Sequence, residues 1–279
     1  MRAVDVQMRR VLDANCFQDP LLEEYLRSSP DNFVVFTDFA CMETYKPASV
    51  ANIHKSIQIA ARHPAQVIVL KPTPEIIRLQ DRDPHLNSDE FIDAGQTKGF
   101  ADFCEGVRLA ANGDQRFERQ VLAFRREALR HFDRMLSEAE GYGESVAAVR
   151  SSLSPDHVRA LRERAPLSGE AAKEMIKSIL LIAGTLFRDH PEVTRLPKPF
   201  SAARKTHIFR IALANYLLAA RWIGDGGALG VKRERLRNDI VDMTYVAFAA
   251  QFDGLLTRDK KMLELYEETR FILDEILAD

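Results

Sequence analysis

Three short apolar runs of strand length, spread widely along the chain, constrain what this sequence can fold into. Short continuous apolar runs are typical of parallel strands that are buried on both faces. Residues 49–62, between the first two runs, place apolar side chains on one face of a helix, as a crossover between parallel strands requires. We therefore predict an α/β fold, with a central parallel sheet flanked by helices and with strands near residues 33–37, 66–71 and 254–257.

The remainder of the chain shows helical patterns. We expect a helical N-terminal extension at residues 1–30, where Pro20 is a plausible first-turn residue before several apolar side chains. Residues 81–200 contain helical patterns separated by Gly- and Pro-containing breaks, and we predict that they form an all-helical insertion. The sheet-containing domain is accordingly expected to consist of residues 1–80 and 201–279.

The amino-acid composition limits the possible functions but does not identify one. The chain has 279 residues, 46% of them hydrophobic, and a formal net charge of −2. This charge argues against wholesale coating of nucleic acid but allows local basic patches. Cys16, Cys41 and Cys104 lack CxxC spacing, so neither a zinc site nor a disulfide framework is predicted. With no apolar run long enough for a signal peptide or a membrane span, we expect a soluble cytoplasmic protein.

Acidic residues follow the strand-like runs. Asp38 comes directly after the first run and Asp259 after the last, while Asp239 and Asp242 begin an uncharged helical stretch. Ligands of open α/β sheets bind beyond the carboxyl ends of the strands, and clustered carboxylates there hold hard divalent cations. A single Asp after a strand is more often a helix cap. Its recurrence at several strand ends favours a metal site.

These residues resemble the PIN-domain family of metal-dependent ribonucleases. The matching pieces are the strand ending in Thr37-Asp38, the strand followed by Glu75, and the closing Asp239/Asp242…Leu-Leu-Thr257-Arg-Asp259-Lys260. The resemblance covers residues 31–80 and 201–279. The chain departs from the family pattern at 39–40, where Phe-Ala replaces a small polar pair, and in the long segment between the two halves.

The resemblance implies hydrolysis by a water that carboxylate-bound Mg²⁺ or Mn²⁺ activates. Asp239 lies one helical turn before Asp242, so one of the two acids can bind the ion directly and the other through water. The second family acid is either Glu75 or its rival Glu43, and we rank Glu75 somewhat higher. The predicted catalytic residues are Asp38, Glu75, Asp242 and Asp259. The predicted metal ligands are Asp38, Glu43, Glu75, Asp239, Asp242 and Asp259.

Basic residues near these acids are candidates for holding phosphate. Charge runs are usually solvated faces, but here they adjoin the predicted metal-site elements. Thr257 either orients a carboxylate, binds phosphate or is simply a strand residue. The predicted substrate-binding residues are Lys46, Lys71, Arg204, Arg237, Thr257, Arg258 and Lys260.

The expected function is a metal-dependent endoribonuclease that cleaves RNA phosphodiester bonds, of a toxin-like or defence-effector kind. Two alternatives stay open from the sequence: a catalytically silent PIN-like binding module and a single-stranded DNA nuclease. The expected partner is RNA or single-stranded DNA, with no membrane. A protein regulator and self-association into a homo-oligomer are also compatible with the sequence.

Overall fold

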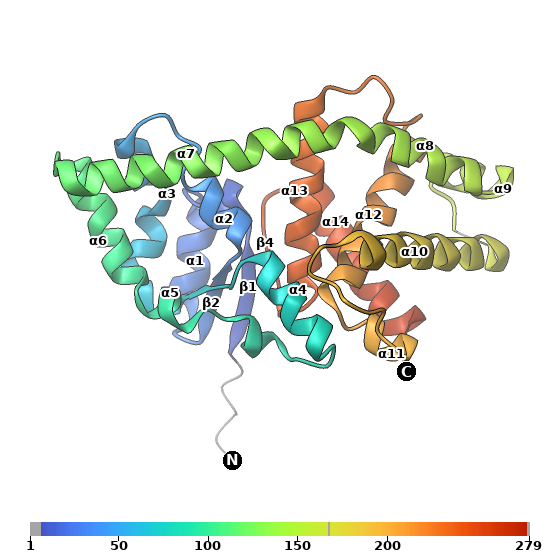
Figure 1. Ribbon diagram of the computed structural model, residues 1–279, viewed down its shortest axis with the longest axis horizontal. Coiled ribbons are helices and arrows are strands. Elements are labelled where there is room, and N and C mark those ends of the chain that lie inside the picture. The colour runs from blue at the N-terminus through green and yellow to red at the C-terminus, as the bar shows by residue number, and fades with distance from the viewer. Residues whose placement is uncertain (1–6, 167, 278–279) are drawn as a thin grey trace, which may run out of the picture. The chain divides into compact units, whose positions relative to one another are not determined.

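The computed structural model describes residues 7–166 and 168–277 and, within them, contains a four-stranded parallel sheet (Figure 1). The strand order is β3-β2-β1-β4, and each neighbouring pair is parallel. All three predicted runs form strands of this sheet, so the predicted α/β class with a parallel sheet flanked by helices is confirmed. The strands are β1 (Met8–Leu12), β2 (Asn32–Phe36), β3 (Val67–Val69) and β4 (Gly254–Leu256).

The helical extension predicted at residues 1–30 is wrong where β1 forms. This strand lies inside the sheet and pairs with β2 on one side and with β4 on the other. Its Arg9 and Arg10 hide the strand pattern in the sequence, whereas Val11 and Leu12 are completely buried. Pairing with two neighbours that are distant in sequence overrides the local preference of these residues. Residues 1–6 lie outside the described part of the chain.

Side-chain caps set the starts of the first helices. Asp19 accepts a hydrogen bond from the N–H of Leu21 at the start of α1 (Pro20–Ser28). Thr37 and Ser49 do the same for α2 (Asp38–Glu43) and α3 (Val50–Arg62). Each cap satisfies an N–H group that has no partner within its helix. The later helices are α4 (Thr73–Arg82), α5 (Ala94–Lys98), α6 (Phe100–Ala111), α7 (Gln115–Glu138), α8 (Tyr142–Ser152), α9 (Pro155–Glu163), α10 (Gly169–Asp189), α11 (Phe200–Ala203), α12 (His207–Gly224), α13 (Arg233–Ala249) and α14 (Lys260–Phe271).

Single turns of other helix types join these elements. Four 3₁₀ turns, η1 to η4, lie between the strands and helices, and a π-helical turn, η5, follows α14. They are η1 (Ala14–Cys16), η2 (Pro64–Gln66), η3 (Ser88–Phe91), η4 (Ala139–Gly141) and η5 (Ile272–Ile276).

The chain divides into two compact units. The first holds residues 7–76, 87–133 and 248–263 and contains the whole sheet. Helix α3 packs against α1 and α6 in this unit, and the Phe36 ring of β2 stacks on Phe17 with centroids 5.5 Å apart. The 81–200 segment, predicted to be one helical insertion, is mostly helical but contributes residues to both units.

The second unit holds residues 77–86, 134–247 and 264–277 and is helical. Its central helix, α12, packs against α8, α9 and α10. Arg221 of α12 pairs with Glu264 and Glu268 of α14, each at 2.9 Å. In the described ranges, no helix combines the length and the apolar character needed to cross a membrane.

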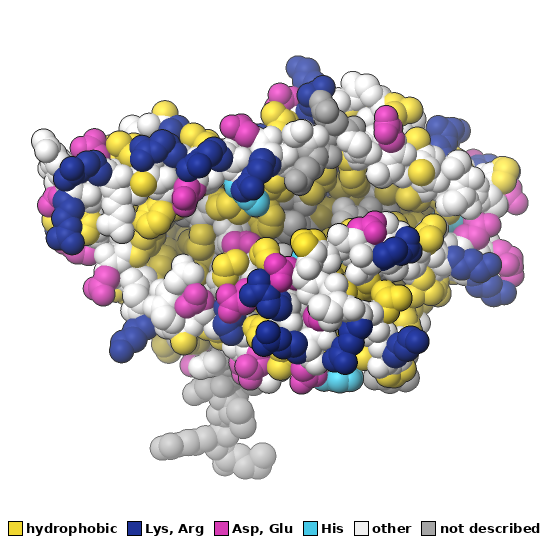
Figure 2. Space-filling model, in the orientation of Figure 1, with side chains coloured by type: hydrophobic (Ala, Val, Ile, Leu, Met, Phe, Trp, Pro, Cys, Tyr) yellow, Lys and Arg dark blue, Asp and Glu magenta, His cyan; other side chains and the backbone are white. Residues whose placement is uncertain are grey.

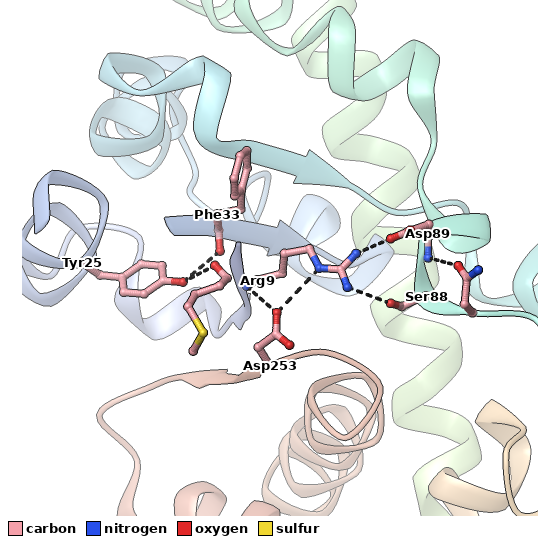
Figure 3. A network of polar contacts seen from close by, with 8 residues as sticks. Arg9, Tyr25, Phe33, Ser88, Asp89 and Asp253 are labelled. Atoms are coloured by element: carbon pink, nitrogen blue, oxygen red, sulfur yellow. Dashed lines mark hydrogen bonds and ion pairs between the residues drawn. The ribbon is translucent and has the colours of Figure 1, made fainter. Parts of the chain in front are cut away.

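A polar network around Arg9 fixes one end of the sheet (Figure 3). The backbone N–H of Arg9 donates to the Asp253 carboxylate at 2.8 Å, and its guanidinium forms an ion pair with Asp89. The Tyr25 hydroxyl donates to the Met8 carbonyl at 2.6 Å. Gly254 begins β4 with φ 149°, a conformation that suits glycine. Contacts from three separate segments therefore hold β1 in place between its neighbours.

Candidate functional site

A buried carboxylate, Asp13, stands at the carboxyl end of β1 and is not among the residues that we predicted from the sequence. It follows Leu12 directly, and only 2% of it is exposed. The Thr257 hydroxyl donates to Asp13 Oδ2 at 2.6 Å, and the Asn15 N–H donates to Oδ1 at 3.1 Å. Burial raises the pKa of Asp13 above its ordinary value, although these hydrogen bonds work in the opposite direction.

Thr257 connects Asp13 with a second acid at the same edge of the sheet. It follows β4, the strand next to β1, and its Oγ1 accepts a hydrogen bond from the Asp259 N–H at 3.0 Å. The Asp259 carboxylate accepts from the N–H groups of Lys261 and Met262 at 2.7 and 3.2 Å, which caps the start of α14. The structure thus brings the predicted Thr257 and Asp259 together with Asp13. Thr257 is buried, and its hydroxyl is bound to Asp13.

Glu43 is the last residue of α2 and lies in the same compact unit as Asp13. Its side chain is 13% exposed, and its negative charge contributes to the raised pKa of Asp13. Lys46, one helical turn later, forms an ion pair with Glu43. By contrast Glu75, the rival acid, is an exposed residue in the first turn of α4. Glu43 is therefore the more buried of the two candidate acids, and its charge acts on Asp13.

Asp38 is held by protein donors. Its carboxylate accepts hydrogen bonds from the Thr73 N–H at 2.8 Å, the Thr73 hydroxyl at 2.9 Å and the Phe39 N–H at 3.0 Å. Burial raises its pKa, and the hydrogen bonds from Thr73 oppose that effect. Asp38 therefore ties the end of β2 to the start of α4, a role that the sequence does not reveal.

The predicted acids Asp239 and Asp242 belong to the second unit. Both lie on α13, and Asp239, 7% exposed, accepts a hydrogen bond from Trp222 Nε1 at 3.1 Å. Asp242 is partly buried. Arg237 lies on the same helix and donates to the side chain of Asn238 at 3.1 Å, and Arg204 follows α11 in the same unit. These residues remain predicted ligands and predicted phosphate contacts.

Three of the predicted cations of the first unit have protein partners. Lys71 donates to the Glu90 carbonyl at 2.6 Å, and Arg258 holds Asp19 through an ion pair of 3.1 Å. Lys46 is shared between Glu43 and the face of the Phe132 ring, 4.5 Å from its centroid. Lys260 is exposed at the start of α14.

The donor chemistry of the Asp13–Glu43 pair suits a hard divalent cation. Both groups offer carboxylate oxygens, the ligands that Mg²⁺ and Mn²⁺ prefer. The charge of Glu43 disfavours the ionised form of Asp13, and a bound cation would relieve that repulsion. No group of three or more His, Cys, Asp or Glu side chains that could hold a metal ion is found within residues 7–166 and 168–277. A site at this pair would therefore complete its coordination with water or with substrate oxygens.

A signal for Asp13 is present in the sequence. Val11-Leu12-Asp13 repeats the pattern of an apolar strand end followed by Asp, which also marks Asp38. The preceding Arg9-Arg10 shortens the apolar run to two residues, too few to indicate a strand by themselves.

Comparisons of the chain with protein-family models, with curated proteins and with solved structures gave no match.

Proposed function

We propose that this protein is a PIN-like, metal-dependent endonuclease that cleaves RNA and uses Asp13 and Glu43 as its central metal ligands. The observation that carries the proposal is the buried Asp13 carboxylate, which lies at the carboxyl edge of a parallel sheet and is bound by Thr257 of the neighbouring strand end. Ligands of open α/β sheets bind at this edge. The resemblance of residues 254–260 to the closing motif of PIN domains supports the reaction class.

Each residue of this site has a distinct part in the proposal. Asp13 and Glu43 hold Mg²⁺ or Mn²⁺, which when bound supplies an activated water and neutralises charge on the phosphate. Thr257 fixes the orientation of Asp13 through its 2.6 Å hydrogen bond. Lys46, paired with Glu43, is placed to exchange that contact for a substrate phosphate. Asp259 positions Thr257 through its backbone N–H.

The remaining predicted acids have other places in the proposal. Asp38 is assigned a positioning role, because its carboxylate connects the end of β2 to Thr73 at the start of α4. Asp239 and Asp242 are kept as further candidate ligands from the sequence resemblance. Glu75 is the alternative to Glu43, and one experiment separates the two.

The test is RNA cleavage by the purified full chain with Mn²⁺, with Mg²⁺ and with EDTA, alongside single-stranded DNA. We expect metal-dependent cleavage of RNA, lowered at least about 100-fold by Asp13→Asn and by Glu43→Gln, since loss of a ligand exceeds the effect of outer-shell changes. Glu75→Gln should retain activity if Glu43 is the ligand. Glu105→Gln, an exposed residue of α6, is the matched control.

Melting temperatures of all variants establish that each is folded. Cleavage by Asp13→Asn at the wild-type rate, in preparations purified identically, would exclude this site. Cleavage lost in Glu75→Gln but kept in Glu43→Gln would reverse the assignment of the second acid. Faster cleavage of DNA than of RNA would keep the metal site and change the substrate.

A further inference from the structure

Helix α7 carries a row of exposed arginines along one side, and four of them lie between residues 116 and 130. Arg116, Arg119, Arg126 and Arg130 are spaced by three, seven and four residues, so they share one face of a helix with 3.6 residues per turn. The buried residues Val121, Ala128 and Phe132 occupy the opposite face. We call these four arginines the arginine ridge. Lys and Arg side chains, dark blue in Figure 2, follow the line of α7 in Figure 1.

The charge of the arginine ridge is largely uncompensated. Among the described residues, none of its four guanidinium groups forms an ion pair with a carboxylate. Arg119 and Arg130 donate only to carbonyls of α7 itself, at 3.2 and 3.3 Å. Glu127 and Asp133 are exposed acidic residues on this face, so the four arginines and these two acids leave a formal charge of +2. An unpaired stripe of this kind attracts a polyanion.

Other side chains of α7 contact the segment that follows Glu43. Arg125 Nε donates to the Pro47 carbonyl at 2.8 Å, and the Lys46 ammonium lies over the Phe132 ring. Phe124, 44% exposed, has its ring centroid 6.0 Å from that of Tyr45. Phe124 is thus an exposed aromatic ring located between the arginine ridge and the end of α2.

We propose that the arginine ridge and Phe124 form a binding surface for single-stranded nucleic acid that leads toward Glu43. Guanidinium groups bind phosphate oxygens in a forked geometry, and an exposed aromatic ring stacks on a base of any identity. The ridge is about 21 Å long at 1.5 Å per residue, enough to follow several nucleotides. The inference rests on the proposed function, because it names the substrate surface of the same site.

Binding is measured without metal, so that it does not depend on cleavage. Fluorescence anisotropy of a labelled, mixed-sequence single-stranded RNA is recorded in EDTA at several salt concentrations. The quadruple variant R116Q/R119Q/R126Q/R130Q is compared with R27Q/R62Q/R108Q/R159Q, which removes the same charge from exposed arginines elsewhere. If the quadruple ridge variant does not fold, R116Q/R119Q and R126Q/R130Q are measured separately.

The ridge variant should bind RNA at least about tenfold more weakly at low salt. The slope of the logarithm of its binding constant against the logarithm of salt concentration should be shallower by roughly 3, because each lost phosphate contact removes about 0.7. The affinity of the control variant should stay within about threefold of wild type, because its arginines do not belong to the proposed binding surface. Phe124→Ala should weaken binding by roughly tenfold without changing the salt dependence. Phe271→Ala, another exposed phenylalanine, should bind like wild type.

Different experimental results would contradict the binding-surface proposal and the nuclease proposal. If wild type does not cleave RNA but the ridge variant alone loses binding, the surface stands and the nuclease proposal falls. Equal affinities of the ridge and control variants overturn the surface, whatever the cleavage assay gives. Tighter binding of duplex than of single strands, or binding of phosphatidylserine vesicles in place of RNA through the same arginines, also overturns it. Equal binding of single-stranded DNA supports backbone recognition.

Discussion

At the residue scale, Asp13 is a buried carboxylate whose burial costs stability at the position where we propose a metal ligand. It is almost fully removed from water, yet three hydrogen-bond donors from Asn15 and Thr257 surround it. Burial dominates, so its pKa is raised, and the charge of Glu43 adds to the effect. Ionising a carboxyl group in such surroundings costs more free energy than ionising it in water.

The pH dependence of stability tests this directly. Because the folded pKa of Asp13 exceeds its ordinary value of 3.8, the folded state keeps the proton longer than the unfolded state. Stability from this group is therefore present below pH 3.8 and is lost as pH rises through the folded pKa. Asp13→Asn should be more stable than wild type at neutral pH in urea unfolding, with the difference shrinking toward pH 3.8. A variant less stable than wild type at neutral pH would contradict this.

At the element scale, single side chains join helices to strand ends. Asp38 connects the end of β2 to α4, and Glu174 of α10 connects to α9 in the second unit. Glu174 accepts from the Ser154 hydroxyl at 2.9 Å and contacts the buried His157 at 3.1 Å. Links of this kind fix the direction in which a helix leaves a turn, because they satisfy backbone N–H groups that the helix leaves open.

The Asp38–Thr73 link can be measured by a double-mutant cycle. Asp38→Ala and Thr73→Val should each lower the free energy of unfolding by about 1–3 kcal/mol, since each removes hydrogen bonds at a partly buried site. The double variant should lose clearly less than the sum, because both changes remove the same contact. Chemical denaturation of the four proteins gives the coupling. Strict additivity would show that the contact contributes nothing to stability.

The lowered pKa of Glu174 predicts how the stability of the second unit changes at acid pH. Hydrogen bonds from the Ser154 N–H and hydroxyl lower the pKa of Glu174 below its ordinary value of 4.5. Its stabilising contribution is therefore present above pH 4.5 and is lost as pH falls through the lower, folded pKa. Glu174→Gln should lose less stability than wild type between neutral and acid pH in thermal melts followed by circular dichroism. Glu170→Gln, an exposed residue of the same helix, should follow wild type.

At the scale of the whole molecule, a bound metal ion stabilises the folded chain by mass action. At about 100 times its dissociation constant, an ion that binds only the folded state adds about 2.7 kcal/mol to the free energy of unfolding. We expect Mn²⁺ to raise the melting temperature of wild type and to leave that of the Asp13→Asn/Glu43→Gln double variant unchanged. An equal rise in both proteins would place the ion elsewhere in the molecule.

The sequence by itself determined the parallel α/β class, because the runs at 33–37, 66–71 and 254–257 are apolar enough to be buried strands in any context. It also indicated that acids follow strand ends, as Asp38 and Asp259 do. These features are local, and a local pattern can be read from neighbouring residues.

Only the tertiary structure determined that residues 8–12 form a strand, β1. The strand exists because its backbone pairs with β2 and β4, which lie far away in sequence, while the charged side chains of Arg9 and Arg10 find Asp89 and the Tyr25 ring as partners. That pairing places Asp13 beside Thr257, 244 residues later. The choice between Glu43 and Glu75 also depends on tertiary packing, because no local pattern contains the direction in which a helix presents a side chain.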